Sequence, residues 1–299
     1  MINWLARVDA GDRSYVVKRY NPAYFHAELI ELSVSAQYHC YTHGVPVAAL
    51  IPNRQGDLIT PASDASYVLF EHVEGRHLPR GGCSPTAARS LGETVGRVAL
   101  ALVDNWRELR EPWTLRKPDE VVRRFERMLA ATENGPTELD RRTAQDVRIR
   151  LAYLHDHHGL YEQVAAMPMQ WIHNDILDTN VLFARDDRVS AVVDFDNTTV
   201  LPRGFDFMWA LEYCVTPTSP ERDHYLQGYL DLVRPSRDEL ASYVPLWSYS
   251  LVCTFWPLET RYLEPERFDP RWEESCWTAF LPTDWEKNLE QVASWLTRG

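Results

Sequence analysis

The chain of 299 residues has no long hydrophobic run, and positive charge is scarce in it. No apolar stretch approaches the ~20 residues of a membrane-spanning helix. Arg7 and Asp9 interrupt the first twenty residues, which excludes the apolar core of a signal peptide. Lysine and arginine number 31 against 43 acidic residues, a net charge of −12. This balance argues against nucleic-acid binding, and we expect a cytoplasmic protein with a small polar, neutral or cationic partner.

Cysteine is also sparse, and its spacing excludes the common zinc-binding patterns. The five cysteines are scattered along the chain and form no CxxC pair. A disulfide framework or a zinc site would need paired or closely spaced cysteines. We therefore expect reduced, mostly buried thiols, so that the chemistry of the protein must come from other residue types.

The first 75 residues are rich in predicted strands and carry one helix. Runs of valine and tyrosine are typical of strands, and Pro, Asn and Gly separate the segments. The helix is predicted to stop near Gly44, with Pro46 just beyond it. The predicted strands are Arg13–Tyr20, Val47–Ile51, Asp57–Thr60 and Ser66–Val73, and the predicted helix is Ala23–Thr42.

The rest of the chain is predicted to be mostly helical. Ser84 and Pro85 are typical of a helix start, and apolar residues from Leu91 to Leu102 follow at helical spacing. Two more helices are predicted over Asp119–Ala131 and Thr137–His155, and short strands surround residues 169–195. We expect an α+β chain with a strand-rich N-terminal lobe (1–75), a hinge near 71–76 and a larger helical lobe (76–299).

One segment in the second half of the chain carries reactive residue types at a specific spacing. Between Ile172 and Phe183, Asp175 is followed five positions later by Asn180, and apolar runs flank both. A valine-rich strand then ends at Asp194. An Asp and an Asn at this spacing mean little alone, because loops are rich in both. The flanking strands, the second Asp and a lysine on a strand far upstream give the pattern its weight.

These residue types suit phosphoryl transfer from a nucleotide. Asp175 would accept the proton of a substrate hydroxyl and orient its oxygen. Asn180 and Asp194 would offer oxygen ligands to Mg²⁺ ions that also bind phosphates. Lys18, one of only three lysines, would hold the α- and β-phosphates and be anchored by a helix carboxylate. The alternative for Lys18 is an exposed lysine on an edge strand.

The chain resembles the aminoglycoside phosphotransferase and choline kinase superfamily, whose bacterial members include homoserine kinases. The catalytic loop of that family typically reads HGD-x-H-P-x-N, and residues 173–180, His-Asn-Asp-Ile-Leu-Asp-Thr-Asn, match it without a gap. The family's metal-binding strand ends I-D-F/W-D/E, which is matched by Val193-Asp194-Phe195-Asp196. A G-P-R-x-x-D-L segment resembles residues 201–207, and the correspondences cover residues 3–210.

The resemblance implies a two-lobed protein-kinase-like fold and roles for further residues. It places the adenine of the nucleotide at the hinge, against Phe70, Glu71 and Val73. His173 would support the catalytic loop. Asp206 would brace the same loop without touching substrate.

The resemblance also predicts a carboxylate on the N-terminal helix as the partner of Lys18. Glu31 and Glu28 lie one helical turn apart on one face, and we favour Glu31. Family members usually begin with a helix, a strand and a nucleotide-covering loop before the strand that corresponds to Asn3–Val8 here. The N-terminal lobe therefore looks shortened at its start, which predicts an unusually open phosphate site.

The catalytic loop departs from the family pattern at three positions. Asn174, Leu177 and Asp178 replace the usual Gly, His and Pro. None of the three carries proton or metal chemistry in the family. The departures therefore weaken assignment to a subfamily and leave the fold assignment intact.

The sequence thus predicts a small-molecule O-phosphotransferase that uses ATP or GTP with Mg²⁺. The first candidate for the acceptor is an aminoglycoside or another basic antibiotic. A metabolic kinase for homoserine, a similar amino alcohol or a sugar is the alternative, and a non-catalytic kinase-like binding protein is the second. We expect a monomer or a homodimer.

Overall fold

The computed structural model describes residues 3–103 and 115–297, which form two compact units. The first unit comprises the described residues up to 103 and residues 168–236, and the second comprises residues 115–167 and 237–297. The predicted boundary between lobes at residues 71–76 stays a prediction. None of the described helices combines the length and the apolar character that crossing a membrane requires.

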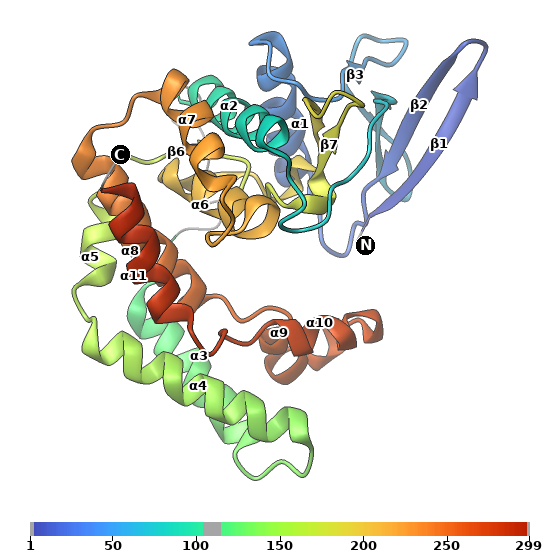
Figure 1. The fold of residues 1–299 in the computed structure, drawn as a ribbon. Coiled ribbons are helices and arrows are strands. Elements are labelled where there is room, and N and C mark those ends of the chain that lie inside the picture. Colours follow the sequence, from blue (N-terminus) through green and yellow to red (C-terminus); the bar gives the residue numbers. More distant parts are fainter. Residues whose placement is uncertain (1–2, 104–114, 298–299) are drawn as a thin grey trace. The chain divides into compact units, whose positions relative to one another are not determined.

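The first unit begins with an antiparallel sheet in the order β1-β2-β5-β3, with β4 also paired to β5 (Figure 1). Lys18 of β2 lies opposite Leu5 of β1 and Val68 of β5, so it sits inside the sheet and not at its edge. The strands are β1 (Trp4–Ala10), β2 (Arg13–Arg19), β3 (Leu50–Ile51), β4 (Ile59–Pro61) and β5 (Ser66–Glu71).

Helix α1 (Ala27–Thr42) packs against this sheet through its apolar face. The buried cluster that joins them comprises Tyr20, Ile30, Val34, Leu50 and Val68. The helix begins four residues later than the predicted Ala23, because residues 21–26 form a turn in which the amides of Tyr24 and Phe25 donate to the Asn21 carbonyl. Strand β3 is shorter than predicted, since Val47 instead bridges Val192.

The remainder of the first unit packs helices beside two short antiparallel pairs of strands, β6 with β9 and the hairpin of β7 with β8. Helix α2 begins as predicted: the Ser84 hydroxyl accepts from the Ala87 amide at 3.2 Å. The elements of this part of the first unit are α2 (Pro85–Ala101), β6 (Gln170–Ile172), η2 (Asp178–Asn180), β7 (Val181–Phe183), β8 (Val189–Val192), η3 (Phe195–Asn197), β9 (Thr199–Leu201), α6 (Gly204–Ala210), the π-helix η4 (Leu211–Val215) and α7 (Arg222–Val233).

Helices α2 and α7 lie side by side (Figure 1) and approach closely at Gly92. A Cβ atom at this position would lie 2.0 Å from the Tyr225 carbonyl oxygen, so only glycine allows the two backbones to meet.

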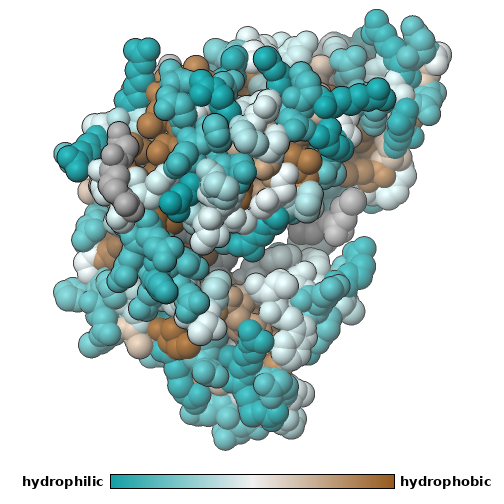
Figure 2. Space-filling model, in the orientation of Figure 1, coloured by the Kyte–Doolittle hydropathy of each residue, from teal (hydrophilic) through white to brown (hydrophobic). Residues whose placement is uncertain are grey.

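Hydrophilic residues cover much of the face drawn in Figure 2, and apolar residues show there in separate areas. All five cysteines are buried and none forms a disulfide, as predicted.

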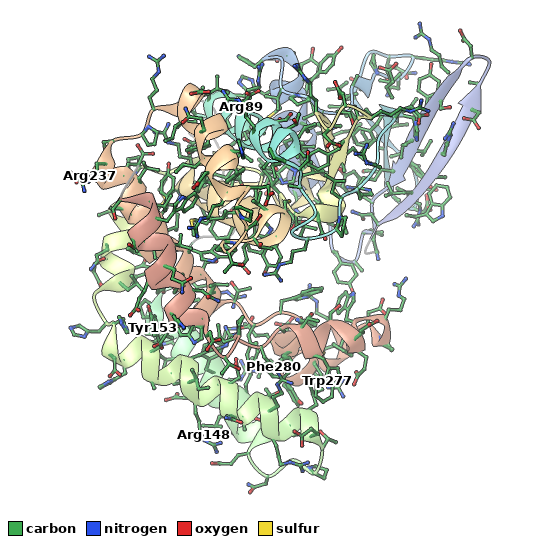
Figure 3. All side chains as sticks on the ribbon, viewed as in Figure 1. Arg89, Arg148, Tyr153, Arg237, Trp277 and Phe280 are labelled. Atoms are coloured by element: carbon green, nitrogen blue, oxygen red, sulfur yellow. The ribbon has the colours of Figure 1, made fainter. Side chains whose placement is uncertain are left out.

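The second unit is helical. The buried Arg150 of α4 forms an ion pair with Asp146 at 2.6 Å and donates to the carbonyls of Val252, in the last turn of α8, and Thr254, just after it. The Tyr153 ring, labelled in Figure 3, packs edge-on against Trp285 of α11. The helices are α3 (Pro118–Thr132), α4 (Glu138–Asp156), α5 (Leu160–Ala165), α8 (Arg237–Cys253), α9 (Leu258–Leu263), η5 (Pro265–Arg267), η6 (Pro270–Trp272), α10 (Glu273–Thr278) and α11 (Trp285–Leu296).

Candidate active site

A single carboxylate on α6 shapes the loop that follows β6. Asp206 is buried, and its two oxygens accept the backbone amides of His173 at 2.8 Å and Asn174 at 2.7 Å. Burial raises the pKa of Asp206 to about 7, and the two amide hydrogen bonds act in the opposite direction. Asn174 has a φ of 63°, in the left-handed region that glycine and asparagine tolerate best. This conformation explains why asparagine can stand where the family usually has glycine.

His173 fixes the loop from inside the fold. Its Nε2 lies 3.1 Å from the Val193 carbonyl, and its Nδ1 lies 3.2 Å from the Asp175 amide nitrogen. These partners assign the proton to Nε2 and leave Nδ1 as the acceptor. Complete burial lowers the pKa of His173 to about 4, so the ring is neutral at physiological pH. His173 thus joins the start of the loop to the strand that leads to Asp194.

Asp175 is held by two side-chain amides. The Nδ2 atoms of Asn180 and Asn197 donate to Oδ2 of Asp175 at 3.0 and 3.1 Å. In the described part of the chain no hydrogen bond reaches Oδ1 of Asp175, which leaves that oxygen for an incoming proton. Burial and the charge of Asp194 raise the pKa of Asp175 to about 6. The carboxylate is therefore a stronger base than an exposed aspartate.

Asp194 follows β8 after one intervening residue, Val193, and faces Lys18 of β2. The Lys18 Nζ atom is 2.8 Å from Asp194 Oδ1, although 176 residues separate the two in sequence. Asp194 has a φ of 66°, a conformation that costs energy for a residue other than glycine and is common at functional sites. Burial raises the pKa of Asp194, but the charge and hydrogen bond of Lys18 outweigh it and hold the pKa below its ordinary value. Asp194 is therefore ionised and carries a negative charge.

Lys18 itself is buried with its charge intact. Burial would lower its pKa, but the charges of Asp196 and Asp194 outweigh this effect and raise the pKa above the ordinary value of lysine. Its ion pairs go to Asp194 and, at 2.6 Å, to Asp196. Glu31 and Glu28 lie exposed on α1, and the structure brings neither of them to Lys18. The exposed-lysine alternative for Lys18 is wrong.

Residues 71–76, the predicted hinge, extend from the end of β5 and pair with the hairpin of β7 and β8. The amide and carbonyl of Arg76 pair with those of Phe183 at 2.9 Å. A Cβ atom on Gly75 would lie 2.7 Å from the Ser190 hydroxyl oxygen, so glycine allows this segment to lie directly on the hairpin. Phe70 is half-buried in β5, and the exposed Glu71 is the last residue of that strand. The half-buried Val73 follows after His72. The backbone of Val73 makes no hydrogen bond within residues 3–103 and 115–297.

The oxygen atoms around Asn180 and Asp194 suit a hard divalent cation. The Asn180 amide nitrogen donates to Asp175, which turns the Asn180 carbonyl oxygen toward other ligands. The Asn180 backbone carbonyl also accepts from Val193, the neighbour of Asp194. No group of three His, Cys, Asp or Glu side chains forms a complete metal site among the described residues. A cation here would need further oxygens from phosphate or water, which is how Mg²⁺ is usually bound.

Two residues of this site, Asp196 and Asn197, were not among the predicted site residues. Both follow Asp194 within η3, and Asp196 belongs to the quoted metal-strand motif. The motif indicated Asp196 as a conspicuous residue but did not indicate that it pairs with Lys18. Nothing in the sequence indicated Asn197, because its hydrogen bond to Asp175 depends on how η3 packs against the loop.

Three solved structures of similar fold span nearly the whole chain. An aminoglycoside phosphotransferase from Alicyclobacillus acidocaldarius has a TM-score of 0.65 at 14% identity, covering 100% of this chain and 92% of that one. A spectinomycin phosphotransferase in complex with ADP and spectinomycin has a TM-score of 0.65 at 14% identity, covering 100% and 91%. A microcompartment-associated aminopropanol kinase has a TM-score of 0.66 at 17% identity, covering 100% and 89%. The predicted kinase-like α+β fold is thereby confirmed.

Sequence comparison identifies the family. No curated protein matches this chain significantly. The model of the phosphotransferase enzyme family matches residues 3–243, which include the sheet, the catalytic loop and η3. The chain belongs to the phosphotransferase enzyme family.

Proposed function

We propose that this chain transfers the γ-phosphate of ATP or GTP to the hydroxyl group of a small polar substrate. The observation that carries the proposal is the arrangement around Asp175. Two amides, from Asn180 and Asn197, occupy one of its oxygens and leave the other oxygen free. A carboxylate held in this way, next to Asp194 and the buried Lys18, is suited to receive a proton beside a phosphate.

The residues of the chain divide the work as follows. Asp175 Oδ1 accepts the hydroxyl proton of the acceptor and orients its oxygen. Lys18 supplies a buried positive charge for the α- and β-phosphates. Asn180 and Asp194 would hold Mg²⁺, which neutralises phosphate charge when it is bound. Asp206 and His173 keep the loop in place through its backbone amides.

The hinge would hold the base of the nucleotide. The Val73 backbone has unused donors and acceptors, which an adenine or guanine edge can satisfy, and Phe70 and Glu71 lead into it. These three residues remain our candidates for base binding. ATP and GTP differ at the edge that would face Val73, so competition between them tests this assignment.

We propose a basic antibiotic, such as an aminoglycoside, as the first candidate for the acceptor. The net charge of −12 favours a cationic substrate. The fold similarity to an aminopropanol kinase supports a second candidate, an amino alcohol or a similar metabolite such as homoserine. Both are hydroxyl compounds with a cationic amine, so the same site chemistry serves either.

ADP release against a panel of aminoglycosides, peptide antibiotics, aminopropanol, homoserine, choline and simple sugars tests the proposal. We expect release above the background hydrolysis rate with at least one amine-bearing alcohol. Asp175→Asn keeps the shape of the side chain and should lower kcat by about 10²–10⁴-fold. Equal nucleotide binding with no transfer to any acceptor, in the wild type and in Asp175→Asn alike, would favour a binding protein without catalysis.

A further inference from the structure

The carboxylate that anchors Lys18 most closely comes from the short segment η3 and not from α1. Lys18 Nζ lies 2.6 Å from Asp196 Oδ2 and 2.8 Å from Asp194 Oδ1. Of the two carboxylates, Asp196 is the less exposed, at 10% of its side-chain area against 45% for Asp194. A buried ion pair with good geometry is costly to break, because one charge is then left without a partner.

Asp196 is itself fixed by two further donors. Asn3 Nδ2 donates to its Oδ2 atom at 2.5 Å, and the Ser33 hydroxyl donates to its Oδ1 atom at 3.2 Å. The Asn3 side chain in turn accepts the amide of Asn21 at 2.9 Å. One carboxylate therefore joins the residue before β1, strand β2 and helix α1 to the segment that carries Asp194. Such a carboxylate has a defined position before any ligand arrives.

Helix α1 contributes a hydroxyl where the family resemblance predicted a carboxylate. Ser33 is buried and points to Asp196, whereas Glu31 is exposed. Two residues along a helix correspond to a rotation of about 200°, so Ser33 and Glu31 face nearly opposite sides. The polarity of the contact is therefore reversed: the helix donates a hydrogen bond to a carboxylate and does not accept one from lysine.

We propose that Asp196 is the positioning residue that holds Lys18 for the nucleotide phosphates, in place of a helix glutamate. The inference rests on the proposed function, because it assumes that Lys18 binds those phosphates. A metal ion bound to Asp194 would compete with Lys18 for the oxygens of that carboxylate. Asp196 keeps its bond to Lys18 whatever Asp194 binds, and Ser33 and Asn3 keep Asp196 in place.

Isothermal titration with ATP and with adenosine, in EDTA and in Mg²⁺, tests this assignment. Asp196→Asn should weaken ATP binding on the order of tenfold to a hundredfold in both conditions, because Lys18 loses its anchor. Adenosine, which has no phosphates, should bind as tightly as to the wild type. Asp196→Glu keeps the charge and should retain most of the ATP affinity that Asp196→Asn loses. Asp57→Asn, an exposed acid elsewhere in this unit, is the matched charge control.

Four results would overturn the inference. Unchanged ATP affinity in folded Asp196→Asn would show that Lys18 needs no anchor there. A loss of ATP affinity that occurs in Mg²⁺ but not in EDTA would indicate that Asp196 is a metal ligand. Equal losses in Asp196→Glu and Asp196→Asn would show that charge is not the cause. A loss in Glu31→Gln as large as in Asp196→Asn would restore the helix carboxylate.

Two further outcomes separate this inference from the function on which it rests. If the wild type binds no ATP, the proposed function fails and the role of Asp196 fails with it. If the wild type binds ATP and Asp196→Asn behaves like it, only the inference fails.

A second variant serves if circular dichroism shows that Asp196→Asn does not fold. Ser33→Ala removes one hydrogen-bond donor to Asp196 and keeps the charges of Lys18 and Asp196. ATP affinity severalfold weaker in Ser33→Ala would support the inference, and unchanged affinity would overturn it.

Discussion

Asn197 donates its side-chain amide to Oδ2 of Asp175 at 3.1 Å, from a position 22 residues further along the chain. Asn180 donates to the same oxygen at 3.0 Å. The two donors together fix the plane of the carboxylate and direct its other oxygen away from them. Within this small-molecule kinase, Asn197 is thus a positioning residue for the proposed base.

Asn197→Ala should lower kcat on the order of tenfold and leave the KM for ATP nearly unchanged. The reason is that one charge-assisted hydrogen bond to Asp175 is lost, while Lys18 and the hinge are untouched. Steady-state kinetics at saturating acceptor measure the effect. A rise in the KM for ATP with an unaltered kcat would contradict this role.

Activity should fall on the acid side of about pH 6. Burial, followed by the charge of Asp194, raises the pKa of Asp175 to about 6, and the protonated carboxyl cannot accept a hydroxyl proton. As the pH falls through this value the fraction of active base decreases, so kcat/KM should drop about tenfold per pH unit. Bound Mg²⁺ would offset the charge of Asp194 and can only move the acid limb downward.

The same profile offers a control in Asn197→Ala. The hydrogen bond from Asn197 stabilises the ionised carboxylate and lowers the pKa of Asp175. Its removal should therefore move the acid limb to higher pH. A pH-independent rate from about pH 5 to about pH 8 in both proteins would remove Asp175 from the role of base.

Asp206→Asn should destabilise the first unit by about 1–3 kcal/mol. The substitution places an amide N–H₂ against one of two buried backbone amides, those of His173 and Asn174, and leaves that donor without an acceptor. Urea unfolding followed by tryptophan fluorescence measures the change, with Asp57→Asn as an exposed control. Full stability in Asp206→Asn would mean that the loop holds its shape without this carboxylate.

Arg150→Met should destabilise the second unit by about 3–5 kcal/mol. It leaves the buried Asp146 without its ion pair and frees the carbonyls of Val252 and Thr254. The matched control is Arg148→Met on the same helix (Figure 3), which breaks an exposed pair with Glu133 and should cost no more than about 1 kcal/mol. Thermal unfolding of the two variants gives the comparison, and equal shifts would argue against a special role for Arg150.

The local elements of this chain were largely predictable from its sequence. The Ser84–Pro85 helix start, the strand with Lys18 and the loop from His173 to Asn180 all follow from short-range patterns. The start of α1 was placed too early, because the turn that follows Asn21 depends on hydrogen bonds that periodicity does not report. Glu31, the expected partner of Lys18 on α1, does not lie beside it, because the packing of α1 decides which of its side chains point toward Lys18.

By itself, the sequence indicated which side chains form the candidate site: the proposed base Asp175, the proposed metal ligands Asn180 and Asp194, and Lys18, one of only three lysines. Asp175 and Asn180 lie five residues apart in one loop, so local chain geometry constrains their relative position strongly. Only the tertiary structure decided which carboxylate meets Lys18 and which amides hold Asp175. Those contacts join distant segments: Lys18 and Asp194 lie 176 residues apart in the sequence, and Asp196 lies two residues further on. They depend on which face of α1 and η3 is buried, and a shift of two residues along a helix reverses that face.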